Sequence, residues 1–471
     1  MESNRFKSKF RSIYFNQSKF VRTLILLTPM LFWYISLFPA VLTPDSYSVI
    51  AFVRSESVSG FHTVAYELFV KVLSVNGRAI YVVSLFQLIL NYYALYLTTK
   101  FIFNRIFRYP VDCYLITSLL FATPFFGPIS MTIWKDNPHN AFIIIGGIKL
   151  IEIFVSYKFK SKNSRRIWVY ISVIAIGALF RHEAFAVFLV LAALLIMFSL
   201  LKVVSQKTLL NASVIALIIA ALSLCVNSLA QSALNSKPVP KYQRTLSFLL
   251  DLEYVNSKFP KMLDDDSQQI LSEISSGSSL QGARDCDSPF NFWGPGFDES
   301  KANKYSTQIP SIWLAALKSN ARDTVLEARF CRTTSFTLWP FSKMPSSGFW
   351  PTTGISPNEI GFENPRITFP LYTLAFAWSY VWGVNGNLIA WPGLHLGLLL
   401  LVNIYVLTMK SISRRLKFGL SIVTAFFLSR SIVLFITVAS QEFRYQSGLY
   451  FLTMPIIAGL VLTCLKPRKN V

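Results

Sequence analysis

Charged side chains are scarce in this sequence, and acidic ones are the scarcest. Only 14% of its 471 residues are charged, with 23 Asp and Glu against 45 Lys and Arg, whereas 53% are hydrophobic and the mean hydropathy is +0.46. So few charged groups cannot cover the apolar surface of such a chain in water. The composition therefore excludes an ordinary water-soluble protein and predicts one whose solvent is the lipid bilayer.

The chain also lacks short motifs that accompany several common chemistries. It contains no GxGxxG, GxxxxGK[ST], CxxC or HExxH pattern and no internal repeat. Soluble nucleotide chemistry and structural zinc are therefore without support.

Long apolar runs recur along the chain instead. Each is close to the ~20 residues that a helix needs to cross about 30 Å of hydrocarbon. They predict an all-α polytopic membrane protein with about ten transmembrane helices. No small-residue cleavage site follows the first run, so we expect an uncleaved helix there. The predicted spans are residues 21–43, 79–103, 112–130, 139–157, 167–182, 184–203, 208–230, 387–409, 418–440 and 449–465.

The net charge of +22 is explained by the location of the basic residues, before the first span, in alternate short loops and at the end of the chain. Loops rich in Lys and Arg stay in the cytoplasm, so both termini are predicted to be cytoplasmic. Nucleic-acid binding is then not needed to explain the charge. The basic residues are Arg5, Lys7, Lys9, Arg11, Lys19 and Arg22, then Lys158, Lys160, Lys162, Arg165 and Arg166, then Lys410, Arg414, Arg415 and Lys417, and finally Lys466, Arg468 and Lys469.

This topology divides the chain into three parts. Residues 1–230 are predicted to form an N-terminal module of about seven spans, and residues 387–471 a C-terminal module of about three. Between them, residues 231–386 form one large, nearly neutral loop domain outside the cytoplasm. Its apolar end, 366–383, is predicted to be an interfacial or re-entrant helix, because a crossing there would place the basic loop at 410 on the wrong side.

The five cysteines give a weaker indication of compartment. Cys113, Cys225 and Cys464 fall within apolar runs, where cysteine usually acts as a small hydrophobic residue. Cys286 and Cys331 are the only two in the long outward segment. An outward compartment is oxidising, so this pair is a candidate disulfide, with two unpaired thiols as the alternative.

Polar residues gather in the first outward loop. Asp45 follows the first span, and His62 lies near the start of an amphipathic stretch, 61–73, predicted to lie along the outer interface. Asp45 has two interpretations that are compatible with each other: an N-cap of the following helix or a chemically active carboxylate.

Three further outward loops carry ionisable groups. The group at 181–183 interrupts an apolar run from 167 to 203, and three charges in hydrocarbon would be costly, so these residues must lie at an outer turn or line a polar cavity. A solvated turn or a snorkelling arginine explains one loop, but not charge from four loops on one face. The ionisable and aromatic residues concerned are Trp134, Lys135, Asp136 and His139, then Arg181, His182 and Glu183, then Glu442, Arg444 and Tyr445.

Such a set of groups suits chemistry on a lipid-linked phosphate. Arg and Lys neutralise phosphate oxygens, and a carboxylate can take the proton of an attacking hydroxyl as general base. A cavity at the outer interface would leave the lipid tail in the bilayer while an acceptor approaches from water.

At these residues the chain resembles the GT-C superfamily of membrane glycosyltransferases. The shared pattern is a basic N-terminus, an acidic residue after the first helix, an interfacial helix, Lys135-Asp136 in a short second loop, and Arg444-Tyr445 before a helix containing Pro455. The Trp-Lys-Asp and Phe-Arg-His-Glu stretches are similar to bacterial members, including serotype-modifying O-antigen glucosyltransferases.

The resemblance implies a GT-C-like fold that transfers a sugar from a polyprenyl-phosphate donor to an envelope glycan or lipid-linked acceptor. It places the reaction on the outer face of the bacterial cytoplasmic membrane, usually with inversion. Asp45 would be the base, and Asp136 either binds sugar or supports the base. Lys135, Arg181 and Arg444 would hold the donor phosphate. The other predicted substrate-binding residues are His62, His139, Glu183, Glu442 and Tyr445.

No cofactor is predicted. A divalent metal lacks support because neither short outward loop contains Asp-x-Asp, and Asp264-Asp265-Asp266 is better explained as a helix cap or a solvated charge run. Three alternatives stay open: a polysaccharide polymerase or ligase, a transporter or flippase of lipid-linked substrate, and a non-catalytic scaffold. Transporters tend to place ionisable groups near the midplane, often in repeated halves. Here Arg430 and His395 are the main polar residues deep in the predicted spans, and no two halves of the chain correspond.

Overall fold

The computed structural model describes residues 19–55, 60–109, 111–155, 162–200, 206–234, 236, 239–285, 291–333, 369–385, 391–439 and 443–464. Within these ranges the chain forms helices joined by turns, and the only β pairing consists of two isolated bridges. The predicted all-α class is therefore confirmed for the described part of the chain.

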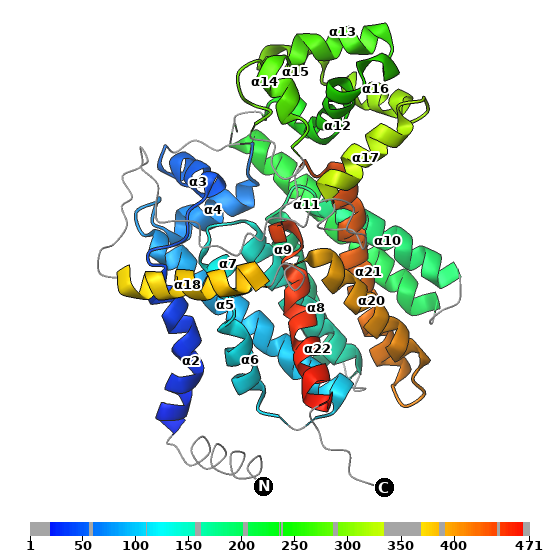
Figure 1. Cartoon of the computed structure of the whole chain (residues 1–471). Coiled ribbons are helices and arrows are strands. Elements are labelled where there is room, and N and C mark those ends of the chain that lie inside the picture. The colour runs from blue at the N-terminus through cyan, green and yellow to red at the C-terminus, as the bar shows by residue number, and fades with distance from the viewer. Residues whose placement is uncertain are drawn as a thin grey trace.

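The helices fall into a membrane body and a smaller helical domain (Figure 1). The body contains α2 (Lys19–Ser36), α3 (Pro44–Arg54), α4 (Val64–Leu73), α5 (Ile80–Phe101) with the π-helix η1 (Ile102–Phe107), α6 (Cys113–Phe121), α7 (Gly127–Met131), α8 (Asp136–Val155), α9 (Lys162–Leu179), α10 (Ala184–Leu200), α11 (Gln206–Ala233), α18 (Phe369–Asn385), α20 (Pro392–Thr408), α21 (Arg414–Thr437), the 3-10 helix η5 (Phe443–Gln446) and α22 (Gly448–Cys464). The domain contains η2 (Lys241–Arg244), α12 (Leu246–Lys258), η3 (Pro260–Met262), α13 (Asp265–Ile274), α14 (Gly277–Gly282), α15 (Glu299–Tyr305), α16 (Ile309–Ala316) and α17 (Arg322–Thr333).

Among the described residues, five helices are long and apolar enough to cross a membrane: Ile80–Phe107, Asp136–Val155, Leu209–Ala233, Arg414–Thr437 and Arg444–Cys464. Each overlaps a predicted span. Three shorter apolar helices, Leu26–Ser36, Ala184–Leu200 and Pro392–Thr408, overlap three more. These helices are those of a multi-pass membrane protein, and the total of about ten spans stays a prediction.

The predicted span at 112–130 is wrong as one continuous helix. The chain forms α6, a turn and the short α7, because Pro124 and Pro128 lack the N–H groups that a continuous helix would use. Trp33 of α2 packs against this break: its indole nitrogen donates to the Phe121 carbonyl at 2.9 Å. A β-carbon on Gly127 would lie 2.2 Å from the Trp33 ring, so only glycine fits there.

Helix α18 lies across the body, whereas α2 and α22 run along it (Figure 1). Trp378 donates from its indole nitrogen to the Ala122 carbonyl at 2.9 Å, and the Trp382 ring meets Phe125 edge-on at 5.6 Å between centroids. Both contacts fall on the turn that separates α6 from α7. This orientation is the one that an interfacial or re-entrant helix requires.

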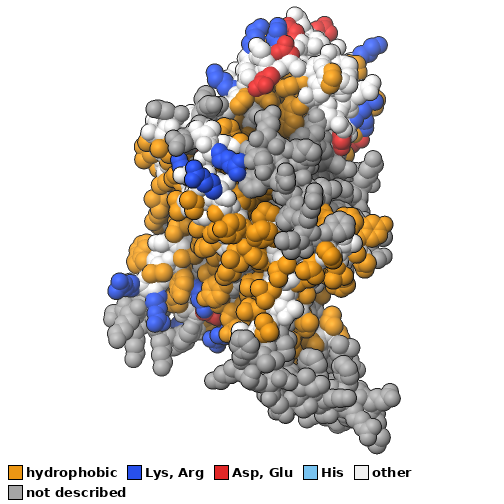
Figure 2. Space-filling view, turned by 90° about the vertical axis from the view of Figure 1, so that its left-hand side faces the viewer, with side chains coloured by type: hydrophobic (Ala, Val, Ile, Leu, Met, Phe, Trp, Pro, Cys, Tyr) orange, Lys and Arg blue, Asp and Glu red, His pale blue; other side chains and the backbone are white. Residues whose placement is uncertain are grey.

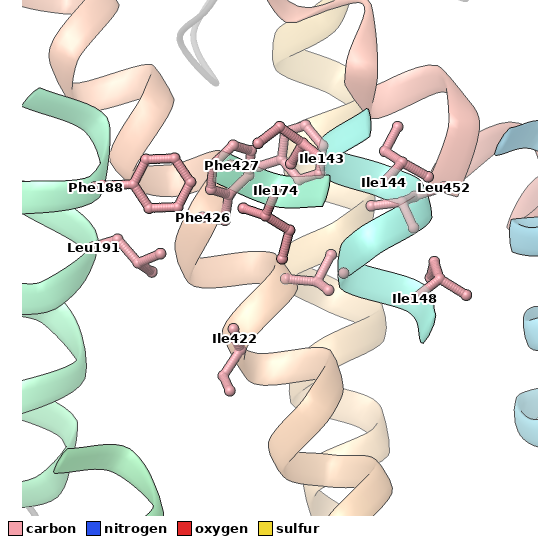
Figure 3. Close-up of a pocket in the computed structure, with 12 residues that line it drawn as sticks. Ile143, Ile144, Ile148, Ile174, Phe188, Leu191, Ile422, Phe426, Phe427 and Leu452 are labelled. Atoms are coloured by element: carbon pink, nitrogen blue, oxygen red, sulfur yellow. The ribbon is translucent and has the colours of Figure 1, made fainter. Parts of the chain in front are cut away.

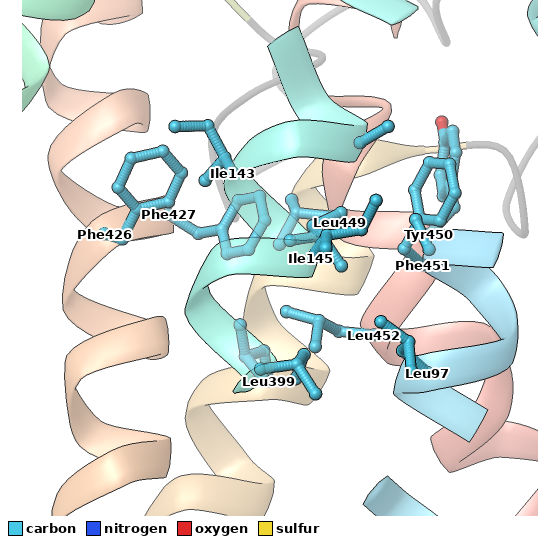
Figure 4. Close-up of a cluster of buried hydrophobic side chains, with 14 of the residues drawn as sticks. Leu97, Ile143, Ile145, Leu399, Phe426, Phe427, Leu449, Tyr450, Phe451 and Leu452 are labelled. Atoms are coloured by element: carbon cyan, nitrogen blue, oxygen red, sulfur yellow. The ribbon is translucent and has the colours of Figure 1, made fainter. Parts of the chain in front are cut away.

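The two parts have separate hydrophobic cores. The body core draws buried side chains from most of its helices, and Figure 4 shows where α5, α8, α20, α21 and α22 meet. The domain core is built from η2 to α17 and includes Leu249, Phe292 and Val325. On the face that Figure 2 shows, hydrophobic side chains form a broad band over the body, with Lys and Arg above and below it.

The described cysteines include one in a disulfide and three free thiols. Cys331 is disulfide-bonded, whereas Cys113, Cys225 and Cys464 are free. Cys286, the predicted partner, lies outside the described residues.

Candidate functional site

Two loops at the domain-facing end of the body are joined directly. Val41 forms an isolated parallel bridge with Thr132, and Ile133 donates its backbone N–H to the Val41 carbonyl at 3.2 Å. The Ser46 hydroxyl donates to the Ile133 carbonyl at 3.1 Å. The start of α3 is therefore fixed beside the loop that carries Lys135 and Asp136.

Asp45 lies in the first turn of α3 but does not cap it, so the N-cap interpretation is wrong. Thr43 is the N-cap, and it forms a reciprocal capping box with Ser46. The Asp45 side chain is thereby left free of the capping role, and its Oδ2 accepts from Arg444 Nη1 at 2.5 Å. The side chains of Asp45 and Arg444 are 29% and 11% exposed, so this ion pair is partly open to solvent.

Electrostatics keep Asp45 ionised. Burial favours the protonated acid, but the Arg444 guanidinium and the Lys135 ammonium outweigh it and lower the pKa of the Asp45 carboxyl. Arg444 in turn lies over the rings of Trp134 and Tyr445, at 4.9 and 5.2 Å from their centroids. These aromatic faces hold the guanidinium beside the carboxylate.

Lys135 contributes a further positive charge next to this pair. Its Nζ lies 5.8 Å from the Phe61 ring centroid, and burial lowers the pKa of the ammonium. Two neighbouring histidines are neutral at pH 7. Burial and the Lys135 charge lower the pKa of His62 to about 3 and that of His182 to about 4. His182 also hydrogen-bonds the backbone of residues 61 and 62.

A second charged group lies deeper. Asp136, the first residue of α8, pairs with Arg181 and lies 3.7 Å from Nη2 of Arg430 on α21. Arg430 Nη1 donates to the side-chain oxygen of Asn140 at 2.5 Å. Arg181 also pairs with Glu183, whose pKa is lowered although burial opposes this, because Arg181 and Lys135 favour the carboxylate. The side chains of Asp136 and Arg181 are only 2% and 3% exposed.

Tyr445 connects the two layers. Its ring faces the guanidinium groups of both Arg181 and Arg444, each 5.2 Å from the ring centroid. It also packs against Leu434 and Val438 at the C-terminal end of α21. One aromatic side chain thus contacts both the deep arginine and the shallow one.

The structure brings most of the predicted residues together. Asp45, Lys135, Asp136, Arg181, Glu183, Arg444, Tyr445 and His62 share one region. His139 is buried in the contact between α8 and α9 instead, where its Nδ1 lies 2.8 Å from the Gly177 carbonyl. Glu442 lies outside the described residues. His182, named with the outward loops but given no role, joins that region, and so do Asn140 and Arg430, which were not assigned to the site; an arginine inside an apolar span was the available signal for Arg430.

An apolar pocket of about 100 Å³ lies among α8, α9, α10, α21 and α22. Figure 3 shows Phe188 and Leu191 of α10 on one side and Ile144 and Ile148 of α8 on the other. Ile144 follows Asn140 by one helical turn, and Phe427, also in the wall, precedes Arg430 by three residues. Two of the helices that line the pocket, α8 and α21, are therefore those that carry Asp136, Asn140 and Arg430.

In the described part of the chain, no group of three or more His, Cys, Asp or Glu side chains is arranged to hold a metal ion. Fold and site together define an α-helical membrane protein with a charged cluster, four basic and three acidic side chains, and an apolar pocket. No family model, curated protein or solved structure matches this chain.

Proposed function

We propose that the protein is an integral membrane glycosyltransferase of the GT-C type. It transfers a sugar from a polyprenyl-phosphate donor to an envelope glycan or lipid-linked acceptor on the outer face of the cytoplasmic membrane. The observation that carries the proposal is the pairing of an accessible carboxylate, Asp45, with Arg444 beside Lys135. A base and phosphate-binding cations are what sugar transfer from a phosphate ester requires.

The chemical step follows from these groups. Asp45 accepts the proton of the acceptor hydroxyl while the hydroxyl oxygen attacks the anomeric carbon from the face opposite the phosphate. The bond between the anomeric carbon and the phosphate oxygen breaks, and the electron pair leaves with the polyprenyl phosphate. The phosphate gains one negative charge, which Arg444, Lys135 and Arg181 stabilise.

Arg444 has a second part in this scheme. A carboxylate held against a guanidinium is a weak base, because the ion pair lowers its pKa. The donor phosphate competes with Asp45 for Arg444 and Lys135. Once those cations bind phosphate, the pKa of Asp45 rises and the carboxylate becomes a better proton acceptor. Donor binding thus activates the base.

Asp136 takes the supporting role in this proposal. It is buried and shared by Arg181 and Arg430, so it is poorly placed to meet an acceptor arriving from water. Its charge instead balances and orients two buried guanidinium groups. The apolar pocket suits the hydrocarbon tail of the donor, which the wall residues of α8, α10 and α21 would contact.

Asp45→Asn tests the function directly. Loss of a positioned general base typically lowers the rate by about 10²- to 10⁴-fold. We expect that loss for the purified variant in lipid nanodiscs, supplied with polyprenyl-phosphate hexose and envelope glycan, while donor binding is retained. Asp112→Asn is the matched control, since Asp112 also starts a helix, capping α6 through the Tyr114 and Leu115 amides, but lies outside the site.

Asp45→Asn protein that folds and transfers sugar at the wild-type rate would remove Asp45 from the reaction. Wild-type protein that moves the lipid-linked sugar across the membrane without transferring it would favour the flippase alternative over an enzyme.

A further inference from the structure

Two arginines of α17 share one carboxylate inside the helical domain. Nε of Arg329 lies 3.3 Å from Asp251 Oδ2, and Nε of Arg332 lies 3.5 Å from Asp251 Oδ1. All three side chains are at most 1% exposed. Buried charges of this kind persist only when further hydrogen bonds satisfy them, so the remaining guanidinium N–H groups identify what each arginine holds.

The two arginines differ in which part of the protein accepts their hydrogen bonds. Arg332 donates to carbonyls within the domain, those of Asp285 at 2.9 Å, Leu250 at 3.3 Å and Ala283. Arg329 donates out of the domain, to the carbonyls of Ile436 at 3.0 Å and Val438 at 2.7 Å.

Both carbonyls that Arg329 binds belong to the C-terminal end of α21, where helical carbonyls have no partner within the helix. A cation is favourable there because it opposes the negative end of the helix dipole. Two more contacts strengthen the same junction. The Ser247 hydroxyl donates to the Ile436 carbonyl at 3.2 Å, and the rings of Phe330 and Phe435 lie 5.3 Å apart.

The end of α21 that Arg329 holds is also the surface against which Tyr445 packs, through Leu434 and Val438. Tyr445 faces the guanidinium groups of Arg181 and Arg444. A second link lies one turn deeper, where Gln446 donates to the Ser431 hydroxyl at 2.6 Å. The contacts therefore run without interruption from Asp251 in the domain to the two site arginines.

We propose that Arg329 is a positioning residue of the membrane site: it clamps the C-terminal end of α21 to the helical domain and thereby sets the spacing of Arg181 and Arg444 through Tyr445. This rests on the proposed function, since those arginines are assigned to the donor phosphate. The domain is then part of the phosphate-binding apparatus although it contributes no group to the cluster.

Two measurements on Arg329→Gln test the clamp and its effect separately. The first is the distance distribution between spin labels at exposed positions Gln281 in α14 and Leu401 in α20, measured in nanodiscs. The second is the affinity for a polyprenyl phosphate without sugar. We expect a broadened distribution and an affinity weaker by roughly two- to thirtyfold, the range of coupling through such contacts.

Arg332→Gln is the matched control, because it leaves the same buried Asp251 with one arginine but breaks no bond to α21. Its distances and affinity should match the wild type even if the domain melts at a lower temperature. Arg329→Lys should be intermediate, since an ammonium keeps the charge but not the fork that reaches both carbonyls. If Arg329→Gln does not fold, Ser247→Ala replaces it as the test variant, because it removes one uncharged donor to the Ile436 carbonyl. We expect it to broaden the distance distribution less than Arg329→Gln would.

A narrow distance distribution in Arg329→Gln would overturn the clamp. Broadening with unchanged affinity would overturn the link to the site, and equal effects in Arg332→Gln would assign both changes to domain folding. If wild-type protein binds no polyprenyl phosphate, the proposed function fails, and the distances alone still decide whether Arg329 holds α21.

Discussion

Carboxylates meet arginines at two depths in the site, and depth decides what each pair can do. An exposed pair contributes about 0–1 kcal/mol, whereas removing one partner of a buried pair costs about 3–5 kcal/mol. Asp45 and Arg444 are partly exposed, so they can exchange partners at little cost. Asp136 and Arg181 are buried, so their pairing is a fixed part of the structure.

The histidines of the site predict a dependence of stability on pH. His62 and His182 have pKa values lowered to about 3 and about 4 in the folded state, against about 6.5 when unfolded. The unfolded chain therefore binds more protons below pH 6.5. Their stabilising contribution is complete above that pH and declines as the pH falls toward 4, by up to ~1.4 kcal/mol per pH unit for each histidine.

Thermal unfolding of detergent-solubilised protein between pH 7.5 and 5 measures this effect. The double variant His62→Gln, His182→Gln should lose less stability on acidification than the wild type. Glu253 has the opposite sign, since burial raises its pKa to about 8 and its contribution declines as the pH rises from 4.5. The wild type and the double histidine variant are therefore both measured in a Glu253→Gln background, which removes this opposing effect. Equal pH dependence of stability in the two proteins would mean that His62 and His182 do not cause it.

The charges of the site were predictable because charge is rare in this chain, but their partners were not. Asp45 and Arg444 lie 399 residues apart, and no spacing rule relates them. Arg430 stood out as an arginine inside an apolar run, yet only the packing of α21 beside α8 shows that it faces Asp136 and Asn140.

At the scale of elements, α5 holds the loop that presents Lys135 and Asp136. Gln87 donates to the Trp134 carbonyl at 3.3 Å, and Asn91 lies 3.5 Å from the side-chain oxygen of Asn137. Asn137 donates to the Ile129 and Thr132 carbonyls at 2.6 and 2.7 Å. These buried amides add to the few backbone bonds of the irregular stretch between α7 and α8, such as that from the Trp134 N–H to the Thr132 carbonyl at 2.8 Å.

Asn137→Leu should therefore destabilise the protein by about 1–3 kcal/mol, because it removes two buried hydrogen bonds of about 0.5–1.5 kcal/mol each. The Ile129 and Thr132 carbonyls keep the backbone N–H groups of Thr132 and Trp134 as donors. Unfolding by titration with SDS measures the loss. Asn227→Leu is the control: its amide is also buried but bonds only the Ser223 carbonyl within α11, at 3.0 Å, so a loss below about 1.5 kcal/mol is expected. Equal losses would mean that the loop does not depend on Asn137.

Hydropathy was enough to predict that the apolar segments are helices. It did not predict where a helix breaks or how a helix is oriented in the bundle. The run at 112–130 is apolar throughout, and Pro124 and Pro128 were the available warning that it would divide. The stretch at 366–383 is apolar enough to cross, and only the balance of basic loops predicts another placement, which stays a prediction. Hydropathy measures length and apolarity, so it cannot distinguish a crossing helix from one that lies across the bundle.

At the scale of the whole molecule, the helical domain and the charged cluster lie at the same end of the body. Arg329 binds the C-terminal end of α21, against which Tyr445 packs. Helix α2 begins and α22 ends at the opposite end (Figure 1). A single orientation of the body in the membrane therefore satisfies all of the predicted locations: the domain and the site outside the cytoplasm, and both termini inside it.

Reporter fusions test that orientation. Fusions at Lys162 and Ile412 should report the cytoplasm, and a fusion at Ser300 the outer compartment, because the loops near the first two carry the basic residues that stay inside. Replacing Arg414, Arg415 and Lys417 with Asn is the control variant and should weaken the cytoplasmic signal at Ile412 while leaving Ser300 unchanged. A cytoplasmic signal at Ser300 would place domain and cluster inside the cell together. An acceptor in the envelope would then be out of reach, and the proposed transfer reaction would be excluded with it.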